Sequence, residues 1–233
     1  MNAFDIKLVA ILSMVSSHAG IFLLPQYPIL VAIGNVAFPI FAWLIANGAR
    51  HSRDINRYLL RLVAFAGVSQ IPFTLANQLI GSPLLYLNVF FTLSLGLLAI
   101  AVARKYANRA FTFAAFAACA IIAQASNTDY GAAGVLSIIA FYLLFDRRLY
   151  LALAQFFILV ILPLAVPSIR QFGRMPIENP YFDHPVDPIA LLAALAVIGV
   201  YNNNEGIRMK YFFYAFYPLQ YIAIYLVLVT FPA

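Results

Sequence analysis

The sequence predicts an all-α, polytopic integral membrane protein that folds as a helical bundle. Of its 233 residues, 64% are hydrophobic and only 9% are charged, and the mean hydropathy is +0.92. A soluble domain is about a quarter charged and about half apolar. The apolar residues run along the whole chain in blocks separated by short polar segments, which is typical of successive membrane spans rather than of one anchor. We therefore expect residues 1–233 to form a single membrane-embedded domain.

Nine apolar blocks are candidates for membrane-spanning helices, because a helix needs about 20 apolar residues to cross the hydrocarbon core. In chain order the blocks are 6–24, 27–49, 58–80, 83–103, 109–125, 131–146, 149–166, 188–202 and 210–231. The first block ends without the small-x-small pattern of a signal-peptide cleavage site, so we interpret it as the first span. The eighth is the shortest.

Prolines and glycines mark two irregular places in this series. The segment 167–187 holds four of the thirteen prolines and is predicted to be an ordered but non-helical excursion. Within the second block, Gly34 and Pro39 predict a helix kink near the proline.

The distribution of basic residues orients the predicted bundle. Twelve of the fourteen lysines and arginines fall on one side if the nine spans alternate, and only Arg170 and Arg174 fall on the other. The positive-inside rule places the richer side, with the N-terminus, in the cytoplasm. The formal net charge of +6 therefore reflects topology, and we expect no nucleic-acid partner.

Several polar residues are predicted to lie inside the membrane or at its outer mouth, and such residues are functional candidates. The candidate catalytic set is Ser17, His18, Asn35, Asn88, Asp129 and Gln220. At 1.5 Å per residue, His18 and Gln220 lie about 15 Å above the cytoplasmic edge. An imidazole can move a proton near neutral pH. The structural alternative is that these side chains hold helices together through hydrogen bonds, with His18 a satisfied buried donor.

A second candidate set is basic and lies on the cytoplasmic side. Arg53, Arg57 and Arg61 are spaced i, i+4, i+8, which predicts one face at the entry of the third span, and His51 precedes them. Guanidinium groups in such a stripe bind phosphates well. The alternative is an edge that snorkels toward lipid phosphates. The sequence has no metal-ligand spacing, so we expect no metal.

Four runs of residues resemble the TraX family of integral membrane pilin N-acetylases. They are IKLVAILSMVSSHAG (6–20), IGNVAFPIFAWLIANGARHSRDINRYLLRL (33–62), SQIPF (69–73) with LNVFFTLSLGLL (87–98) and DYGAAGVL (129–136), and KYFFYAFYPLQYIAIYL (210–226). Three ionisable positions depart from the family pattern: Ser17 stands for an aspartate, Asn35 for an arginine and Gln220 for a histidine.

The resemblance implies a multi-pass protein of the bacterial inner (cytoplasmic) membrane that transfers an acetyl group from acetyl-CoA to the N-terminal amine of pilin. It implies that His18 is the general base, with Asn35 or Asn88 as oxyanion donors, and that His51 and the three arginines hold the CoA phosphates. Because of the three departures, a non-catalytic pilin-binding or pilus assembly factor remains an alternative. A small-solute transporter is a further reading, although no inverted repeat supports it.

Overall fold

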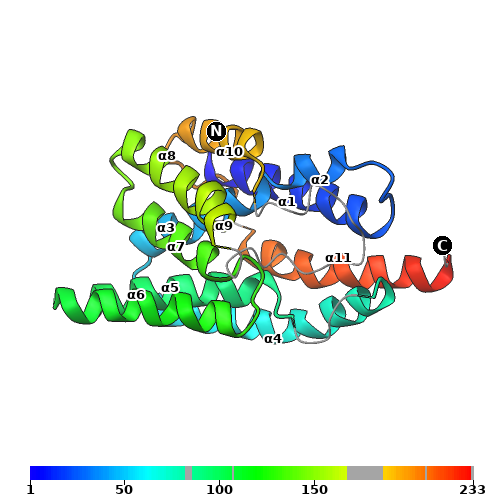
Figure 1. Ribbon diagram of the computed structural model, residues 1–233, viewed down its shortest axis with the longest axis horizontal. Coiled ribbons are helices and arrows are strands. Elements are labelled where there is room, and N and C mark those ends of the chain that lie inside the picture. The colour runs from blue at the N-terminus through cyan, green and yellow to red at the C-terminus, as the bar shows by residue number, and fades with distance from the viewer. Residues whose placement is uncertain (82–85, 107, 167–185, 208, 232–233) are drawn as a thin grey trace. The chain divides into compact units, whose positions relative to one another are not determined.

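Helices make up the regular structure of the protein. The computed structural model describes residues 1–81, 86–106, 108–166, 186–207 and 209–231, and within these ranges the only extended pairing is an isolated bridge between Leu87 and Thr128 (Figure 1). The all-α prediction is therefore confirmed for the described residues. Most of the predicted excursion at 167–187 lies outside them.

A helix occupies each of the nine predicted blocks, and two blocks contain irregularities. The helices are α1 (Ala3–Phe22), α2 (Ile29–Gly34), α3 (Ala37–His51), α4 (Ile55–Leu79), α5 (Val89–Lys105), α6 (Arg109–Ala125), α7 (Gly131–Leu143), α8 (Arg148–Phe156), α9 (Leu162–Ala165), α10 (Pro188–Gly199) and α11 (Lys210–Thr230). The second block is thus α2 followed by α3. A π-helical segment, η1 (Phe157–Ile161), joins α8 to α9 in the seventh.

Five of these segments are long and apolar enough to cross a membrane. They are Ala3–Phe22, Ile29–His51, Ile55–Leu79, Arg148–Ala165 and Tyr211–Thr230. The apolar helices α6, α7 and α10 are shorter. The protein is therefore a membrane protein that contacts a lipid bilayer, whereas the count of nine spans and the cytoplasmic N-terminus stay predictions.

The predicted kink in the second block lies at Asn35 and Val36, before the proline rather than at it. Asn35 is the C-cap of α2, and α3 begins at Ala37. Pro39 therefore sits in the first turn of α3, where backbone N–H groups have no partner within the helix and a missing one costs little. The chain turns just upstream of the proline for this reason.

The backbone forms two compact units. The first unit comprises Met1–Phe41, Val68–Leu84 and Gly173–Ala233, and the second comprises Ala42–Gly67 and Leu85–Phe172. The sequence predicted one domain over 1–233, and that stays a prediction.

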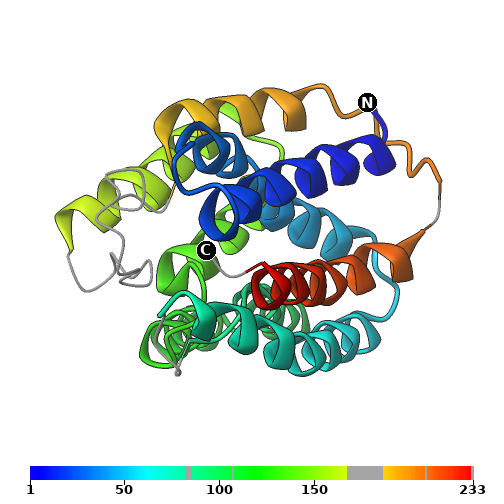
Figure 2. The ribbon, with the colours of Figure 1, turned by 90° about the vertical axis from the view of Figure 1, so that its right-hand side faces the viewer.

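The first unit is organised around α1. Asn2 caps α1 by accepting from the backbone N–H groups of Phe4 and Asp5, and the Asp5 carboxylate accepts from the Asn2 N–H in return. The helix packs against α2 (Figure 2) and also contacts α11. The hydroxyl of Ser16 donates to the Leu30 carbonyl at 2.9 Å, which ties α1 to α2.

The second unit has its core between α5, α6 and α7. Its buried cluster consists of Ala99, Phe116, Cys119, Ala120, Ala123, Ala132, Val135 and Ile139. The small residues in this set let the three helices approach closely, as is usual between membrane helices. Fully buried Gln155 of α8 accepts from the Ser137 hydroxyl at 2.7 Å and donates to the Ser137 carbonyl at 3.0 Å, so α7 and α8 are linked by a satisfied polar pair.

Candidate functional site

The candidate site residues divide between the two units. Ser17, His18, Asn35 and Gln220 belong to the first unit. The second unit holds Asn88 and Asp129 together with the basic candidates His51, Arg53, Arg57 and Arg61.

His18 lies on α1 within an aromatic cluster to which α11 contributes most. The ring centroids of Tyr221, Tyr217 and Phe22 lie 4.8, 6.1 and 6.3 Å from the imidazole centroid. The Tyr221 hydroxyl and His18 Nε2 are 3.2 Å apart and share a hydrogen bond. Because α1 and α11 are both candidate membrane spans, this bond links two such helices through polar side chains.

The Gln220 side chain also lies near the imidazole of His18. His18 Nδ1 and Gln220 Oε1 are both buried, and neither has a hydrogen-bond partner within the described part of the chain. The structure therefore brings together two candidates that lie about 200 residues apart in sequence, one from each end of the chain.

Ser17 and Asn35 lie at the contact between α1 and α2 rather than on the imidazole. A Cβ placed on Gly34 would be 2.1 Å from the Ser17 Cβ, so Ser17 packs directly on the backbone of α2. Asn35 is 9% exposed and ends α2, where its N–H donates to the Val31 carbonyl. Among the hydrogen bonds of the described residues, none joins Ser17 to His18.

Asp129 sits in the short connection between α6 and α7, surrounded by hydroxyl groups. Tyr86 donates to Asp129 Oδ1 at 3.1 Å, and the Thr92 hydroxyl contacts both the Asp129 carbonyl and, at 3.0 Å, the Thr128 hydroxyl. Burial raises the pKa of the Asp129 carboxyl to about 7, although the hydrogen bonds from the Tyr86 hydroxyl and the Tyr130 N–H act to lower it. This carboxyl is therefore poised to gain or lose a proton near neutral pH.

Asn88 is fully buried and both ends of its amide have structural partners. Oδ1 accepts from the Phe90 N–H at 3.0 Å, which makes Asn88 the N-cap of α5, and Nδ2 donates to the Ala66 carbonyl of α4 at 2.9 Å. The cap also explains why this helix begins at Val89 rather than at 83, where the apolar block starts.

We expect Asn88→Ala to destabilise the protein by about 1–3 kcal/mol, since it removes the cap and leaves the Ala66 carbonyl without this donor. Thermal unfolding in detergent measures the loss. Asn88→Ser is the matched control, because a serine keeps the cap and only the α4 contact is lost. An Asn88→Ala protein as stable as wild type would contradict the structural role.

The predicted arginine stripe is only partly helical. Arg53 precedes α4, which begins at Ile55, so Arg57 and Arg61 alone share a face of the helix. Asp54 accepts from the Arg57 N–H and pairs with Arg57 Nε, both at 2.9 Å, and this neutralises the middle of the stripe. Aspartate is favoured at the N-cap of a helix, and α4 begins directly after Asp54. Arg53 therefore lies outside the helical face that the spacing predicted.

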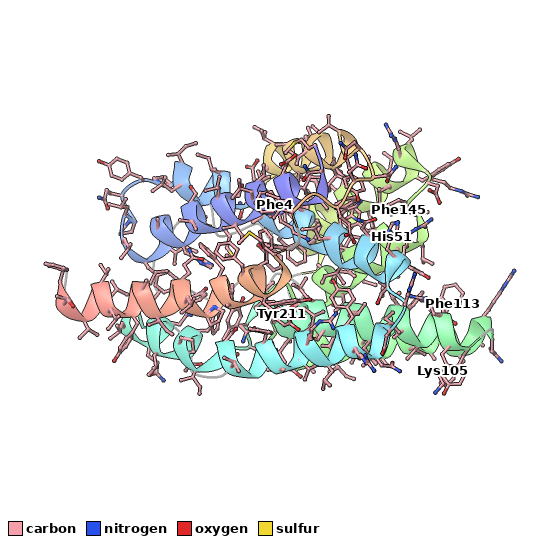
Figure 3. All side chains as sticks on the ribbon, turned by 180° about the vertical axis from the view of Figure 1, so that it is seen from behind. Phe4, His51, Lys105, Phe113, Phe145 and Tyr211 are labelled. Atoms are coloured by element: carbon pink, nitrogen blue, oxygen red, sulfur yellow. The ribbon has the colours of Figure 1, made fainter. Side chains whose placement is uncertain are left out.

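The remaining basic candidates differ in their surroundings. Arg61 lies over the Tyr58 ring at 5.7 Å, and its Nε is buried without a hydrogen-bond partner in the described residues. His51 is exposed at the end of α3, where Nδ1 meets the Asn47 carbonyl at 2.9 Å (Figure 3). Within the described residues, no group of three or more His, Cys, Asp or Glu side chains is placed to hold a metal ion.

Sequence reasoning missed several partners that the structure supplies. Arg104 donates to the Ala49 carbonyl at the end of α3 at 2.6 Å, and Arg50 pairs with Asp146 at 3.2 Å. Tyr221 and Tyr86 touch His18 and Asp129. The sequence does contain a signal for Tyr221, because this residue directly follows the candidate Gln220 in an aromatic-rich helix.

Comparison with known proteins gives two matches over nearly the whole chain. The family model described as TraX protein matches residues 4–228. The probable fimbrial assembly protein FimC, serogroup H1, of Dichelobacter nodosus is 26% identical over 234 residues, which cover 94% of this chain and 92% of that protein. No solved structure matches.

Proposed function

Because this chain belongs to the TraX family, we propose that it acts in a pilus or conjugation system as a membrane-embedded acetyltransferase. It would move an acetyl group from cytoplasmic acetyl-CoA to the N-terminal amine of pilin. The name of the similar fimbrial assembly protein supports the pilus setting. We place the protein in the bacterial inner membrane with nine spans and a cytoplasmic N-terminus, as the positive-inside distribution of its arginines and lysines indicates.

The observation that carries the proposal is the imidazole of His18, held by a tyrosine hydroxyl between two candidate membrane spans. In the proposed reaction the amine nitrogen attacks the thioester carbonyl, and His18 takes the proton that the amine releases. A new C–N bond forms, the C–S bond breaks, and CoA leaves as a thiolate that then takes up a proton. Burying a histidine inside a membrane bundle costs free energy, so its presence there makes it a functional candidate.

The other candidates have supporting roles in this proposal. His51, Arg53, Arg57 and Arg61 would bind the CoA phosphates, with Arg57 already partly neutralised by Asp54. Asn35 is the better candidate for an oxyanion donor, because both ends of the Asn88 amide have structural partners. Asp129, with its pKa near 7, can exchange a proton near neutral pH.

Mass spectrometry of the pilin N-terminus tests the proposal. Pilin co-expressed with the wild-type protein should gain the mass of one acetyl group, and His18→Ala should abolish that gain. Leu12→Ala is the matched control on the same helix, because Leu12 is 61% exposed and packs little against the protein. Unmodified pilin with the wild type, or equal modification with His18→Ala, would overturn the proposal.

A non-catalytic role in binding pilin or assembling the pilus is the second candidate. The absence of ionisable side chains at Ser17, Asn35 and Gln220 favours it, as does the word assembly in the name of the similar protein. The two functions differ in a direct way, since only the enzyme releases free CoA when purified protein, acetyl-CoA and pilin are mixed.

A further inference from the structure

We infer that Gln220 and Tyr221, consecutive residues of α11, together fix His18 in the tautomer that carries its hydrogen on Nδ1, which makes Nε2 the basic nitrogen. The inference rests on the proposed function only for its catalytic consequence. The assignment of the tautomer concerns the resting protein, and it is testable without pilin or acetyl-CoA.

The first step concerns Nε2. A tyrosine hydroxyl has one hydrogen to donate and lone pairs to accept with, so its 3.2 Å contact with Nε2 is compatible with either tautomer. The choice must therefore be made at the opposite nitrogen of the ring. Whichever group meets Nδ1 decides whether Nε2 accepts from Tyr221 or donates to it.

At Nδ1, the available partner can only accept a hydrogen bond. The Gln220 side chain lies near the ring, and its Oε1 is a carbonyl oxygen, which accepts hydrogen bonds and never donates them. Nδ1 and Oε1 are both buried, and each lacks a hydrogen-bond partner among the residues that the structure describes. The imidazole also interacts with the Gln220 side chain. The simplest way to satisfy both atoms is a hydrogen on Nδ1 that is donated to Oε1.

The third step concerns the membrane. Unpaired polar atoms are destabilising in hydrocarbon, and α1 and α11 are both candidate membrane spans. The terminal torsion of a glutamine is soft, so the Gln220 amide can rotate to accept the hydrogen of Nδ1. With Nδ1–H donated to Gln220, Nε2 keeps its lone pair and accepts the hydrogen of Tyr221.

The consequence is that residue 220 positions the base. Ser17, next to His18 in sequence, packs on Gly34 instead of the ring. Gln220 is therefore a positioning residue that holds the imidazole from the α11 side. In the proposed acetyl transfer, Nε2 receives the proton of the amine, and the Tyr221 hydroxyl gives up its place at Nε2 when this happens.

Nuclear magnetic resonance of the imidazole nitrogens tests the tautomer directly. The purified protein would carry ¹⁵N-histidine together with His51→Gln and His184→Gln, so that His18 is the only histidine. We expect a protonated, pyrrole-type signal from Nδ1 and an unprotonated, pyridine-type signal from Nε2. The opposite assignment, or an equal mixture, would overturn the inference.

Three variants in the same single-histidine background separate the two partners. Gln220→Leu removes the acceptor and should abolish the preference for Nδ1–H, whereas Gln220→Glu keeps an acceptor oxygen and should preserve it. Tyr221→Phe should leave the hydrogen on Nδ1 and shift only the Nε2 signal. If Gln220→Leu keeps the wild-type pattern in a folded protein, Gln220 does not set the tautomer.

Acetylation of pilin gives the second readout. If the proposed function holds, Gln220→Leu should lower the rate at saturating substrate at least about twofold, because only the fraction of His18 that keeps its hydrogen on Nδ1 has a free base at Nε2. Gln220→Glu should restore much of the rate. Wild-type pilin that stays unmodified would defeat the proposed function and leave the tautomer assignment standing. A wild-type enzyme that acetylates pilin but holds the hydrogen on Nε2 would defeat this inference alone.

Discussion

Replacing Asp129 with asparagine is expected to remove the loss of stability that follows when the buried Asp129 carboxyl ionises. Burial raises the pKa of the folded carboxyl to about 7, compared with about 3.9 for an aspartate in an unfolded chain. Between these values the folded protein binds more protons than the unfolded chain. The free energy of unfolding of the wild type therefore falls as the pH rises through this window.

The size of the effect follows from the same two pKa values. A shift of about three units corresponds to about 4 kcal/mol, all of it lost above about pH 7. An asparagine stays neutral, and its Oδ1 can still accept from the Tyr86 hydroxyl. Asp129→Asn should therefore be close to the wild type at about pH 4 and more stable by up to about 4 kcal/mol at about pH 8.

Unfolding in detergent micelles at both pH values measures this difference. Asp146→Asn is the matched control: the Asp146 side chain is 78% exposed, so the wild-type pH dependence should survive in that variant. A stability curve for Asp129→Asn that is parallel to that of the wild type would show that the carboxyl is not buried as the structure has it.

Gly34→Ala is expected to cost about 1–3 kcal/mol or more, because the contact between α1 and α2 has no room for a methyl group. The added Cβ would lie 2.1 Å from the Ser17 Cβ, 2.6 Å from its Cα and 2.8 Å from its backbone nitrogen. Two of these atoms belong to the backbone and cannot rotate away, so the helices would have to separate.

The matched control is Gly67→Ala in α4. A Cβ at Gly67 meets no other atom within 4 Å in the described part of the chain, and alanine is the better helix former. This variant should be as stable as the wild type or more stable by about 0.5–1 kcal/mol. Equal melting temperatures for Gly34→Ala and Gly67→Ala would contradict the close approach at Ser17.

The positions of the helices were predictable because apolar runs are a local property of the chain. Each block from 6–24 to 210–231 contains a helix, and the irregularity near Pro39 was expected within a few residues. The boundaries moved where a single side chain caps a helix, as Asn88 does for α5 and Asp54 for α4. Caps depend on individual hydrogen bonds, which hydropathy does not record.

The roles of the polar residues were harder to predict, because they depend on partners far along the chain. His18 was a candidate from the sequence, but its contact with Tyr221 joins residues 203 positions apart. Asp129 was expected at the outer mouth, and its contact with Tyr86 joins residues 43 positions apart. Periodicity placed Arg53 on a helix face that the local chemistry of Asp54 cut short. Spacing alone predicts neither the distant partners of His18 and Asp129 nor the local cap at Asp54.

The π-helical segment η1 has a consequence for the phase of the helix that contains it. Each residue of an α-helix turns the chain by about 100°, so the extra residue of a π-turn offsets the faces before and after it by about that angle. Upstream, Gln155 points inward, and downstream Leu159 and Pro163 are also buried. These buried positions are four residues apart, a spacing at which a regular α-helix drifts by about 40° per step. The wider turn thus acts as a rotational spacer, which offsets part of this drift and keeps the buried positions of both halves closer to one face.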